Sequence, residues 1–412
     1  MTERGRFEVV RDPLWNNIGL DPEALGVLDS EPVQRLRYVR QLGHAFLVYP
    51  GATHTRFEHA LGTYHLARRT LSLLRDRGDV DGIDEASVTL VRLAAMLHDV
   101  GHYPFSHALE EAGLPSHEGL AAQRMRHPEL AAALEATGIP RAAERITALI
   151  DGTSTDPLQG LISGDIDLDK IEYLTRDAHM CGVPYGTVDV DRLMHSLTLV
   201  NGEAGPTVGM HEKGVAALES LLFAKYQMYR NVYWHHAIRS ATAMFKRCVR
   251  DAIARHQLHA EGIAETTDEA LMEVLRGVPD APLATQLRRR RLHKRVLDIP
   301  AADLPDSAGA WVSADPDLVA LVEDRLAAEC GLPSGGLLLD YPRKPAMLAS
   351  NLPVVTRHGE IAPARLSIAG VAEDLHRAAR RLRVFSNAPV VLDRNRVLSL
   401  VEMNAADVRA GL

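Results

Sequence analysis

Four of the 19 histidines in this 412-residue chain lie within one stretch of 20 residues. They are His98, His102, His107 and His117, and the first three belong to the segment LHDVGHYPFSH. Even spacing would place about one histidine in such a stretch. Imidazole side chains bind metal ions and transfer protons near neutral pH, so the cluster predicts a metal-binding or catalytic site. An isolated His-Asp pair is also compatible with two hydrogen-bonded polar groups in a core.

Two expected helices position the histidines and their neighbours. The helix in HTRFEHALGTYHLARRTLSLL opens with a Thr-x-x-Glu capping pattern, and its first turn carries Arg56 and His59 on one face. The helix in DEASVTLVRLAAMLHDVG has an apolar stripe that continues onto His98, with Asp99 beside it. Gly101 is expected to end this helix and to let the chain turn.

A third helix, expected over residues 165–180, supplies further polar groups. Asp169, Tyr173 and Asp177 recur every four residues, so they share one face, and Lys170 borders that face. Asp169 is therefore expected to point toward the same interior as the histidines.

Two imidazoles and two carboxylates are thus directed inward, namely His59, His98, Asp99 and Asp169. A buried charge without a partner is costly, so convergence of these four side chains on a cation explains the pattern. Nitrogen and oxygen donors of this kind suit a divalent transition metal (Mn, Fe, Zn, Co or Ni) and not a soft, thiophilic ion.

The overall composition is that of a globular protein, with 46% hydrophobic and 24% charged residues. The net charge of −8 argues against a surface built for polyanions, so nucleic acid binding is possible but not indicated. No apolar run approaches the roughly 20 residues that span a bilayer, and the first residues lack a signal-peptide core. No membrane contact and a cytoplasmic location are expected. Cys181, Cys248 and Cys330 are too far apart to indicate a disulfide framework.

The chain is expected to be mainly α-helical, with two regions. Residues 1–260 read as a helical catalytic core that includes one long helix over 214–256. Residues 261–412 read as a smaller α+β region, because GGLLLDYP, NLPVVTRHGEI and APVVLDRNRV favour strands.

Several of these segments together resemble a known family. HTRFEH, HDVGHYPFSH, SHEG and GDIDLDKIEYLTRDAH are similar to the motifs of the HD-domain phosphohydrolases, and most similar to the deoxynucleoside triphosphate triphosphohydrolases, some of which join a SAM domain to the HD domain. The resemblance covers roughly residues 6–260. It implies an HD-domain helical core, a homo-oligomer (dimer or tetramer), and hydrolysis of dNTPs to deoxynucleoside and triphosphate. It also implies that Mg²⁺ accompanies the triphosphate.

The resemblance assigns roles to single residues. His59, His98, Asp99 and Asp169 match the family's metal ligands. His117 matches the acid that protonates the leaving 5′-oxygen, with Glu110 where the family has an aspartate, a change that keeps the charge and lengthens the arm. His102 and His107 match histidines near the α-phosphate. The substrate-binding positions are Arg56, Lys170, Arg230 and Tyr173 for the phosphates, and Gln41, Leu42 and Asp177 for the sugar.

Two positions depart from the family. Ile238 stands where the family has the tyrosine that excludes a 2′-hydroxyl, and Arg239 follows in place of a glutamine. Discrimination between dNTP and NTP therefore stays open, unless Tyr229 or Tyr233 takes that tyrosine's place.

Some family members are activated by nucleotides, and part of that signature is present. A packing element around residues 34–38 and a solvated helix face around 288–295 explain the same residues equally well, and Glu8 replaces a lysine of the family's site. The matching residues are Asp29, Gln34 and Arg37 for one activator, and Arg290 and Lys294 for a second.

The sequence therefore predicts a metal-dependent phosphohydrolase acting on dNTPs. Two alternatives stay open: the same metal site acting on another nucleotide or phosphoester, and a nucleotide or nucleic acid sensor without catalysis.

Overall fold

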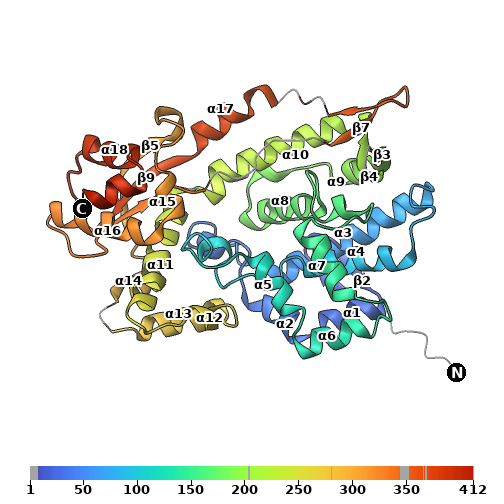
Figure 1. Cartoon of the computed structure of the whole chain (residues 1–412), viewed down its shortest axis with the longest axis horizontal. Helices are drawn as coiled ribbons and strands as arrows, with labels where there is room; N and C mark the ends of the chain where they lie inside the picture. Colours follow the sequence, from blue (N-terminus) through green and yellow to red (C-terminus); the bar gives the residue numbers. More distant parts are fainter. Residues whose placement is uncertain are drawn as a thin grey trace.

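A computed structural model describes residues 8–202, 205–279, 281–343, 352–364, 366 and 369–411. Helices dominate this part of the chain, so the prediction of a mainly α-helical protein is confirmed (Figure 1). Up to residue 260 the helices are α1 (Pro22–Leu28), α2 (Glu31–Arg35), α3 (Arg56–Asp76), α4 (Glu85–Leu97), α5 (His117–Arg124), α6 (Pro128–Glu135), α7 (Ala142–Asp151), α8 (Leu168–Cys181), α9 (Val190–Met194), α10 (Val215–Met228) and α11 (His236–Ala254). Those that follow are α12 (Ala260–Ile263), α13 (Asp268–Gly277), α14 (Pro282–Arg288), α15 (Ala310–Ala314), α16 (Pro316–Glu329), α17 (Ala369–Ala379), α18 (Arg394–Glu402) and α19 (Ala405–Ala410).

The strands of the described residues form small sheets between the helices. They are β1 (Glu8–Asp12), β2 (Asn16–Leu20), β3 (Leu197–Gly202), β4 (Gly205–His211), β5 (Lys294–Pro300), β6 (Leu337–Asp340), β7 (Pro353–Val355), β8 (Ile361–Pro363) and β9 (Arg381–Ser386). β1 and β2 form an antiparallel hairpin, the second sheet has the order β3-β4-β7-β8, and the third has the order β5-β9-β6. Neither the β1–β2 hairpin nor the β3–β4 hairpin was predicted, because the sequence up to residue 260 was interpreted as mostly helical.

Helices α3 and α4 start as their sequences predict, but α4 ends earlier than predicted, before Gly101. The capping box at the start of α3 is present, and the backbone N–H of Thr55 donates to the Glu58 carboxylate at 2.6 Å. Asp84 caps α4 by accepting from the backbone N–H of Ser87 at 2.6 Å. α4 ends at Leu97, so the His98 and Asp99 side chains project from the end of a buried helix.

Gly101 has a different role from the one predicted. Its φ is not in the left-handed region, so no turn requires glycine there. A Cβ at this position would lie 2.1 Å from the carbonyl oxygen of His117 and 2.5 Å from the backbone nitrogen of Ala121. Glycine therefore allows α5 to pack directly against the segment that follows His98.

Helix α8 begins three residues later than predicted. Asp167 caps it by accepting from the backbone N–H of Lys170 at 2.8 Å, which fixes the first turn. The helix ends at Cys181, followed by Gly182 at φ 67°. The face that carries Asp169 is therefore retained, although the start of the helix differs.

The prediction of one continuous helix over residues 214–256 is wrong. α10 ends at Met228, a π-helical turn covers Tyr229–Tyr233, and α11 starts at His236. The side chain of His235 caps α11 by accepting from the backbone N–H of Ala237 at 3.3 Å. Such π-helical turns are rare and are frequent at functional sites.

One of the predicted strands is also wrong. Residues 388–393, in APVVLDRNRV, form no strand, and Asp393 instead caps α18 by accepting from the backbone N–H of Asn395 at 2.9 Å. The central strand of that sheet is β9, just before this segment. The strands predicted in GGLLLDYP and NLPVVTRHGEI are present as β6, β7 and β8.

The two predicted regions are in contact at several places. β7 pairs in parallel with β4, so residues from beyond 260 extend a sheet that begins before it. One apolar cluster joins Phe105 and Phe245 to Leu338 and Phe385, from both sides of residue 260. A domain boundary at that residue stays a prediction.

A buried ion-pair cluster also ties α11 to the C-terminal sheet. The Arg239 guanidinium donates to both carboxylate oxygens of Glu111, at 3.0 and 2.7 Å, and from Nε to Asp340 at 2.9 Å. Lys246 adds a bond to Glu111 at 3.1 Å. The Arg239 side chain is only 6% exposed and that of Asp340 is fully buried.

Removing Arg239 should therefore destabilise the fold. Arg239→Met leaves two buried carboxylates with one lysine, so the free energy of unfolding should fall by about 3–5 kcal/mol in chemical denaturation. Arg69→Met is the matched control, because Arg69 pairs with Asp191 at the surface, and it should change the same quantity by less than about 1 kcal/mol. Equal effects of the two substitutions would contradict this role.

Within the described residues, no helix is long and apolar enough to cross a membrane. Cys181, Cys248 and Cys330 are all free, in agreement with the absence of a disulfide framework in the prediction.

Candidate active site

A cavity of about 550 Å³ lies where the ends of α4 and α8 meet the segment 102–118 and the π-helical turn. His59 lies behind its wall and is fully buried. Most residues singled out from the sequence line the cavity: Gln41, Leu42, Arg56, His98, Asp99, His102, His107, Glu110, His117, Asp169, Tyr173 and Asp177.

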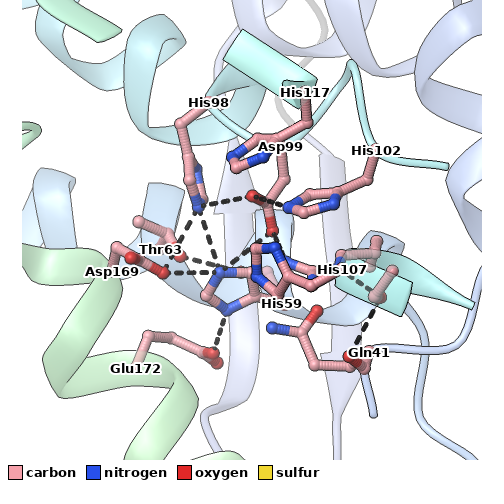
Figure 2. A network of polar contacts seen from close by, with 12 residues as sticks. Gln41, His59, Thr63, His98, Asp99, His102, His107, His117, Asp169 and Glu172 are labelled. Atoms are coloured by element: carbon pink, nitrogen blue, oxygen red, sulfur yellow. Dashed lines mark hydrogen bonds and ion pairs between the residues drawn. The ribbon is translucent and has the colours of Figure 1, made fainter. Parts of the chain in front are cut away.

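Three of the four predicted metal ligands form one compact group. The Nε2 atoms of His59 and His98 are 3.1 Å apart, and Asp169 Oδ1 lies 3.0 and 3.4 Å from them (Figure 2). The ligand atoms of these residues all lie within 4.8 Å of one another. α3, α4 and α8 each contribute one side chain, as the helical periodicities predicted.

The second ring nitrogen of each histidine determines what the first can do. His98 Nδ1 lies 2.9 Å from the carbonyl oxygen of Ala95, which can only accept, so Nδ1 carries the proton. His59 Nδ1 lies 2.6 Å from the Glu172 carboxylate and is a donor for the same reason. When both rings are neutral, their Nε2 atoms present lone pairs toward each other and toward Asp169. A cation between them removes this repulsion.

Asp99 borders the group and links it to the next histidines. Its two carboxylate oxygens each lie 3.5 Å from one Nε2 atom, Oδ2 from that of His59 and Oδ1 from that of His98. Oδ2 also accepts from Arg56 at 2.5 Å, and Oδ1 lies 3.1 Å from His102 Nε2. Burial alone raises the pKa of Asp99, but Arg56 and the neighbouring histidines hold it well below its usual value, so it is ionised.

The donor set fits a divalent transition metal. Ligand atoms at about 2.1 Å from a common ion lie about 3.0 Å apart at a right angle and about 3.4 Å apart at a tetrahedral angle. The separations of 3.0–3.5 Å found here are in that range. Glu172, which accepts from the outer nitrogen of His59, is the kind of carboxylate that orients metal-bound histidines.

A second group of histidines lies beside the first and surrounds Glu110. His117 Nδ1 is 2.8 Å from Glu110 Oε1, so the longer glutamate arm reaches its predicted partner. His107 Nδ1 is 3.4 Å from Oε2, and the His107 side chain is 59% exposed. The rings of His102 and His117 stack with centroids 3.8 Å apart.

Burial and charge separate the protonation states of these two stacked rings. Burial, followed by the charge of Arg56, lowers the pKa of His102 well below its usual value, so this ring is neutral. Burial also acts to lower the pKa of His117, but the hydrogen bond with Glu110 and the charge of Asp99 outweigh it, so that pKa is raised. Neighbouring groups with pKa values pushed apart are typical of acid and base pairs in enzymes.

The three cationic side chains predicted to bind phosphates differ in whether they line the cavity. Arg56 lines the cavity, where its Nε donates to Ser106 Oγ at 3.1 Å. Lys170 instead bonds to its helix-capping residue Asp167, and Arg230 is exposed on the π-helical turn. Neither Lys170 nor Arg230 is among the described residues that line the cavity, so the structure gives no support to either as a phosphate ligand.

The residues predicted to hold the sugar lie together at one side of the cavity. Asp177 is buried and accepts from Tyr233 Oη at 2.7 Å, while its other oxygen lies 2.7 Å from His54 Nε2. The amide oxygen of Gln41 is buried and has no hydrogen-bond partner among the described residues. Ile238 also lines the cavity.

Comparison with known proteins agrees with this arrangement. Residues 56–159 match the HD domain family, and residues 188–395 match the family described as the HD associated region. The uncharacterized protein MJ1154 of Methanocaldococcus jannaschii is 32% identical over 408 residues, which are 97% of this chain and 82% of that protein. The chain belongs to the HD-domain phosphohydrolases.

Other HD-domain proteins match over shorter lengths. The uncharacterized protein YwfO of Bacillus subtilis is 33% identical over 266 residues, 63% of this chain and 56% of that protein. Human SAMHD1, named a deoxynucleoside triphosphate triphosphohydrolase, is 28% identical over 263 residues, 56% of this chain and 42% of that protein. The matched regions thus span about half the length of these two relatives.

A crystal structure of a hypothetical protein from Aquifex aeolicus superimposes on nearly the whole HD-domain chain. The TM-score is 0.71 at 27% sequence identity, and the match covers 96% of this chain and 99% of that one. The arrangement of both the helical core and the C-terminal region is therefore shared with a solved structure.

Several residues of the HD site were not found from the sequence. Glu172 follows Asp169 by one turn of α8, but an acidic residue at that spacing has no specific signal. His54 approaches Asp177 from a segment 123 residues away in the chain. Tyr233 was considered only as a replacement for the family's tyrosine, and its contact with Asp177, 56 residues away, was not predicted. Their contacts depend on tertiary structure, and only the π-helical turn brings Tyr233 to the cavity.

The residues predicted to bind activators lie outside this cavity. Arg37 bonds to the side chain of Gln34, and Asp29 ends α1 nearby. Arg290 donates to the carbonyl oxygen of Leu47 at 2.7 Å, and Lys294 begins β5. Nucleotide activation stays a prediction.

Proposed function

We propose that this HD-domain protein is a metal-dependent hydrolase that splits dNTPs into deoxynucleoside and triphosphate. The observation that carries the proposal is the presence around one cavity of the His59, His98 and Asp169 group, of the His117–Glu110 pair and of the buried Asp177. The named activity of SAMHD1, a partial relative, supports the choice of dNTPs.

The chemistry requires activation of water and protonation of a leaving group. A divalent metal held by His59, His98, Asp99 and Asp169 would polarise the α-phosphate and favour ionisation of the attacking water. Attack at the α-phosphorus breaks its bond to the 5′-oxygen, and His117 donates a proton to that oxygen as the deoxynucleoside leaves. Glu110 holds the His117 ring and stabilises its charged form.

The remaining assignments concern substrate binding. Arg56 supplies a permanent charge for a phosphate, and the neutral ring of His102 donates a hydrogen bond without adding charge. Tyr173 is assigned as a hydroxyl donor to the phosphates. Gln41, Leu42 and Asp177 are assigned to the sugar. Tyr233, which donates to Asp177, is assigned the role of limiting space near the 2′-carbon.

The pH dependence of activity should report on His117. The acid must be protonated, so log kcat/KM should fall as pH rises through the pKa of His117. Glu110 raises that pKa, so Glu110→Gln should lower it and move the alkaline limb of the profile to lower pH. Glu118→Gln is the control, because Glu118 lies 3.6 Å from the other ring nitrogen and contributes least. Identical alkaline limbs for Glu110→Gln and the unmodified protein would contradict the assignment.

One observation favours a second candidate function. Lys170 and Arg230 are absent from the described lining of the cavity, which includes Arg56, Arg239 and Arg343. Arg56 already pairs with Asp99, and Arg239 with Glu111 and Asp340, so few unpaired permanent cations are available for a polyphosphate. A nucleoside monophosphate or another phosphoester needs fewer permanent cations. A sensor without catalysis is the third possibility, and binding of nucleotide and metal without turnover would support it.

Product analysis distinguishes these functions. The purified protein is incubated with each of the four dNTPs, with GTP or with a deoxynucleoside monophosphate, and with Mn²⁺ or Mg²⁺. The assay is run with and without a second nucleotide, and the products are separated by chromatography. The proposal predicts deoxynucleoside and triphosphate. Release of orthophosphate, or turnover of monophosphates alone, would contradict it. The same experiment tests activation, while a homo-oligomer and a cytoplasmic location stay predictions.

A further inference from the structure

Glu172 is the centre of a buried hydrogen-bond network behind the metal-binding group. One of its oxygens, Oε2, accepts from His59 Nδ1 at 2.6 Å. The other, Oε1, accepts from Trp15 Nε1 at 2.9 Å and from Arg176 Nε at 2.7 Å. His59, Glu172 and Arg176 are fully buried (Figure 2 shows the first two). The carboxylate therefore has three charged or polar donors, and water does not reach it.

The β1–β2 hairpin supplies the indole and is fastened to the same network. Asp12 Oδ1 accepts from the backbone N–H groups of Leu14 and Trp15, at 2.9 and 2.7 Å, which closes the turn. Its other oxygen, Oδ2, accepts from Arg176 Nη1 at 3.0 Å. The turn thus contacts both Glu172 and the arginine that holds Glu172.

Helix α3 leaves space for this carboxylate at one position. A Cβ on Gly62 would lie 1.9 Å from Glu172 Oε1 and 2.8 Å from Arg176 Nη2. Gly62 comes one turn after His59 on the same helix. The close approach of α3 and α8 at this glycine places the carboxylate directly against the outer nitrogen of His59.

We infer that Trp15 and the β1–β2 turn are positioning elements of the metal centre, which hold Glu172 so that His59 keeps Nδ1 protonated and Nε2 directed at the ion. The inference rests on the metal site of the proposed function. Trp15 contacts neither metal nor substrate and acts through Glu172. The N-terminal hairpin, which lies outside the HD domain match at residues 56–159, is then part of the site's construction.

The effect of losing this support follows from the geometry. Without the indole N–H, Oε1 keeps a single donor, and the carboxylate is free to rotate away from His59 Nδ1. Removal of such outer partners of a metal-bound histidine typically weakens metal binding about 10–100-fold.

The test is a comparison of metal affinities. The full chain is freed of metal with a chelator and titrated with Co²⁺ against a competing chelator, and the visible spectrum of bound Co²⁺ is recorded. Trp15→Phe keeps an aromatic ring but removes the indole N–H, and it should weaken Co²⁺ binding about 10-fold. Asp12→Asn loosens the same turn and should weaken binding in the same direction.

Trp311→Phe is the matched control. It removes an indole N–H that donates to the carbonyl oxygen of Leu400 at 3.3 Å, in the C-terminal region. It should leave Co²⁺ affinity unchanged. The unfolding midpoint of each metal-free variant is measured as well, because a residue that only stabilises the fold shifts this midpoint without changing the affinity of the folded protein.

The outcomes separate the inference from the proposed function. Unchanged Co²⁺ affinity in Trp15→Phe and Asp12→Asn, or an equal loss in Trp311→Phe, would overturn the inference and leave the metal site in place. Absence of Co²⁺ binding by the unmodified protein would overturn both.

Discussion

Asp169→Ala is expected to abolish both metal retention and hydrolysis. A single oxygen of Asp169 lies within 3.4 Å of both facing Nε2 atoms, whereas Asp99 reaches each of them with a different oxygen. Without Asp169, His59 and His98 would have to bind the ion with Asp99 alone. The loss in kcat/KM should exceed the roughly 100-fold that marks the upper range for outer partners of a metal site. Metal content by elemental analysis and initial rates measure the two effects.

Asp165→Ala is the matched control for this prediction. Asp165 is an exposed carboxylate four residues earlier in the chain, before α8 begins. It should keep its metal and its rate. Full metal content in Asp169→Ala would show that the ion is bound elsewhere.

His117→Ala is expected to retain metal but to lower kcat by about 10²–10⁴-fold, the usual contribution of a general acid. The structure supports this separation, because the His117 ring bonds to Glu110 and stacks on His102 rather than joining the His59 group. Its raised pKa keeps it protonated further toward alkaline pH than an ordinary histidine.

His107→Ala provides the comparison for the acid. The His107 side chain is more than half exposed, and its contact with Glu110 is longer, at 3.4 Å. Its kcat should fall less than that of His117→Ala. Wild-type turnover by His117→Ala, or a larger loss in His107→Ala, would assign the acid to another residue.

The helices that position the proposed metal ligands could be predicted because their signals are local. A capping box starts α3, an aspartate caps α4, and a repeat of four residues aligns Asp169 with Asp177 on α8. Each signal lies within a few residues of the side chain that it positions. The inward direction of His59, His98 and Asp169 agrees with the periodicities of their segments, and Asp99 was placed only as the neighbour of His98.

The break between α10 and α11 has no comparable local signal. No proline or glycine interrupts residues 215–254, and helical apolar spacing continues through the π-helical turn. The turn is held from outside, since Tyr233 donates to Asp177 and Tyr49 donates to the carbonyl oxygen of Asn231. Tertiary contacts of this kind override helix propensity.

The incorrect strand at residues 388–393 has a similar cause. Its two valines suggested a strand, but Val391 is fully exposed and pairs with no other strand. The sheet instead uses β9, where Leu382 and Val384 are fully buried. Two adjacent apolar segments could each have formed the strand, and the sequence pattern does not distinguish them. The one that is buried in the folded chain forms it.

The site itself was only partly predictable, for the same reason. Glu172 and Trp15 meet across 157 residues of sequence, and no motif connects them. Lys170 was expected at the phosphates because it matches a phosphate-binding position of the family, but its ammonium group bonds to the nearby Asp167. Competition among close polar partners is decided by geometry that only the folded chain supplies.

The most direct test of the proposed reaction is hydrolysis of a dNTP in water enriched in oxygen-18, with both products analysed by mass spectrometry. Attack at the α-phosphorus with cleavage of its bond to the 5′-oxygen predicts one labelled oxygen in the released triphosphate and none in the deoxynucleoside. Label in the deoxynucleoside, or release of labelled orthophosphate or pyrophosphate in place of triphosphate, would contradict the proposed reaction.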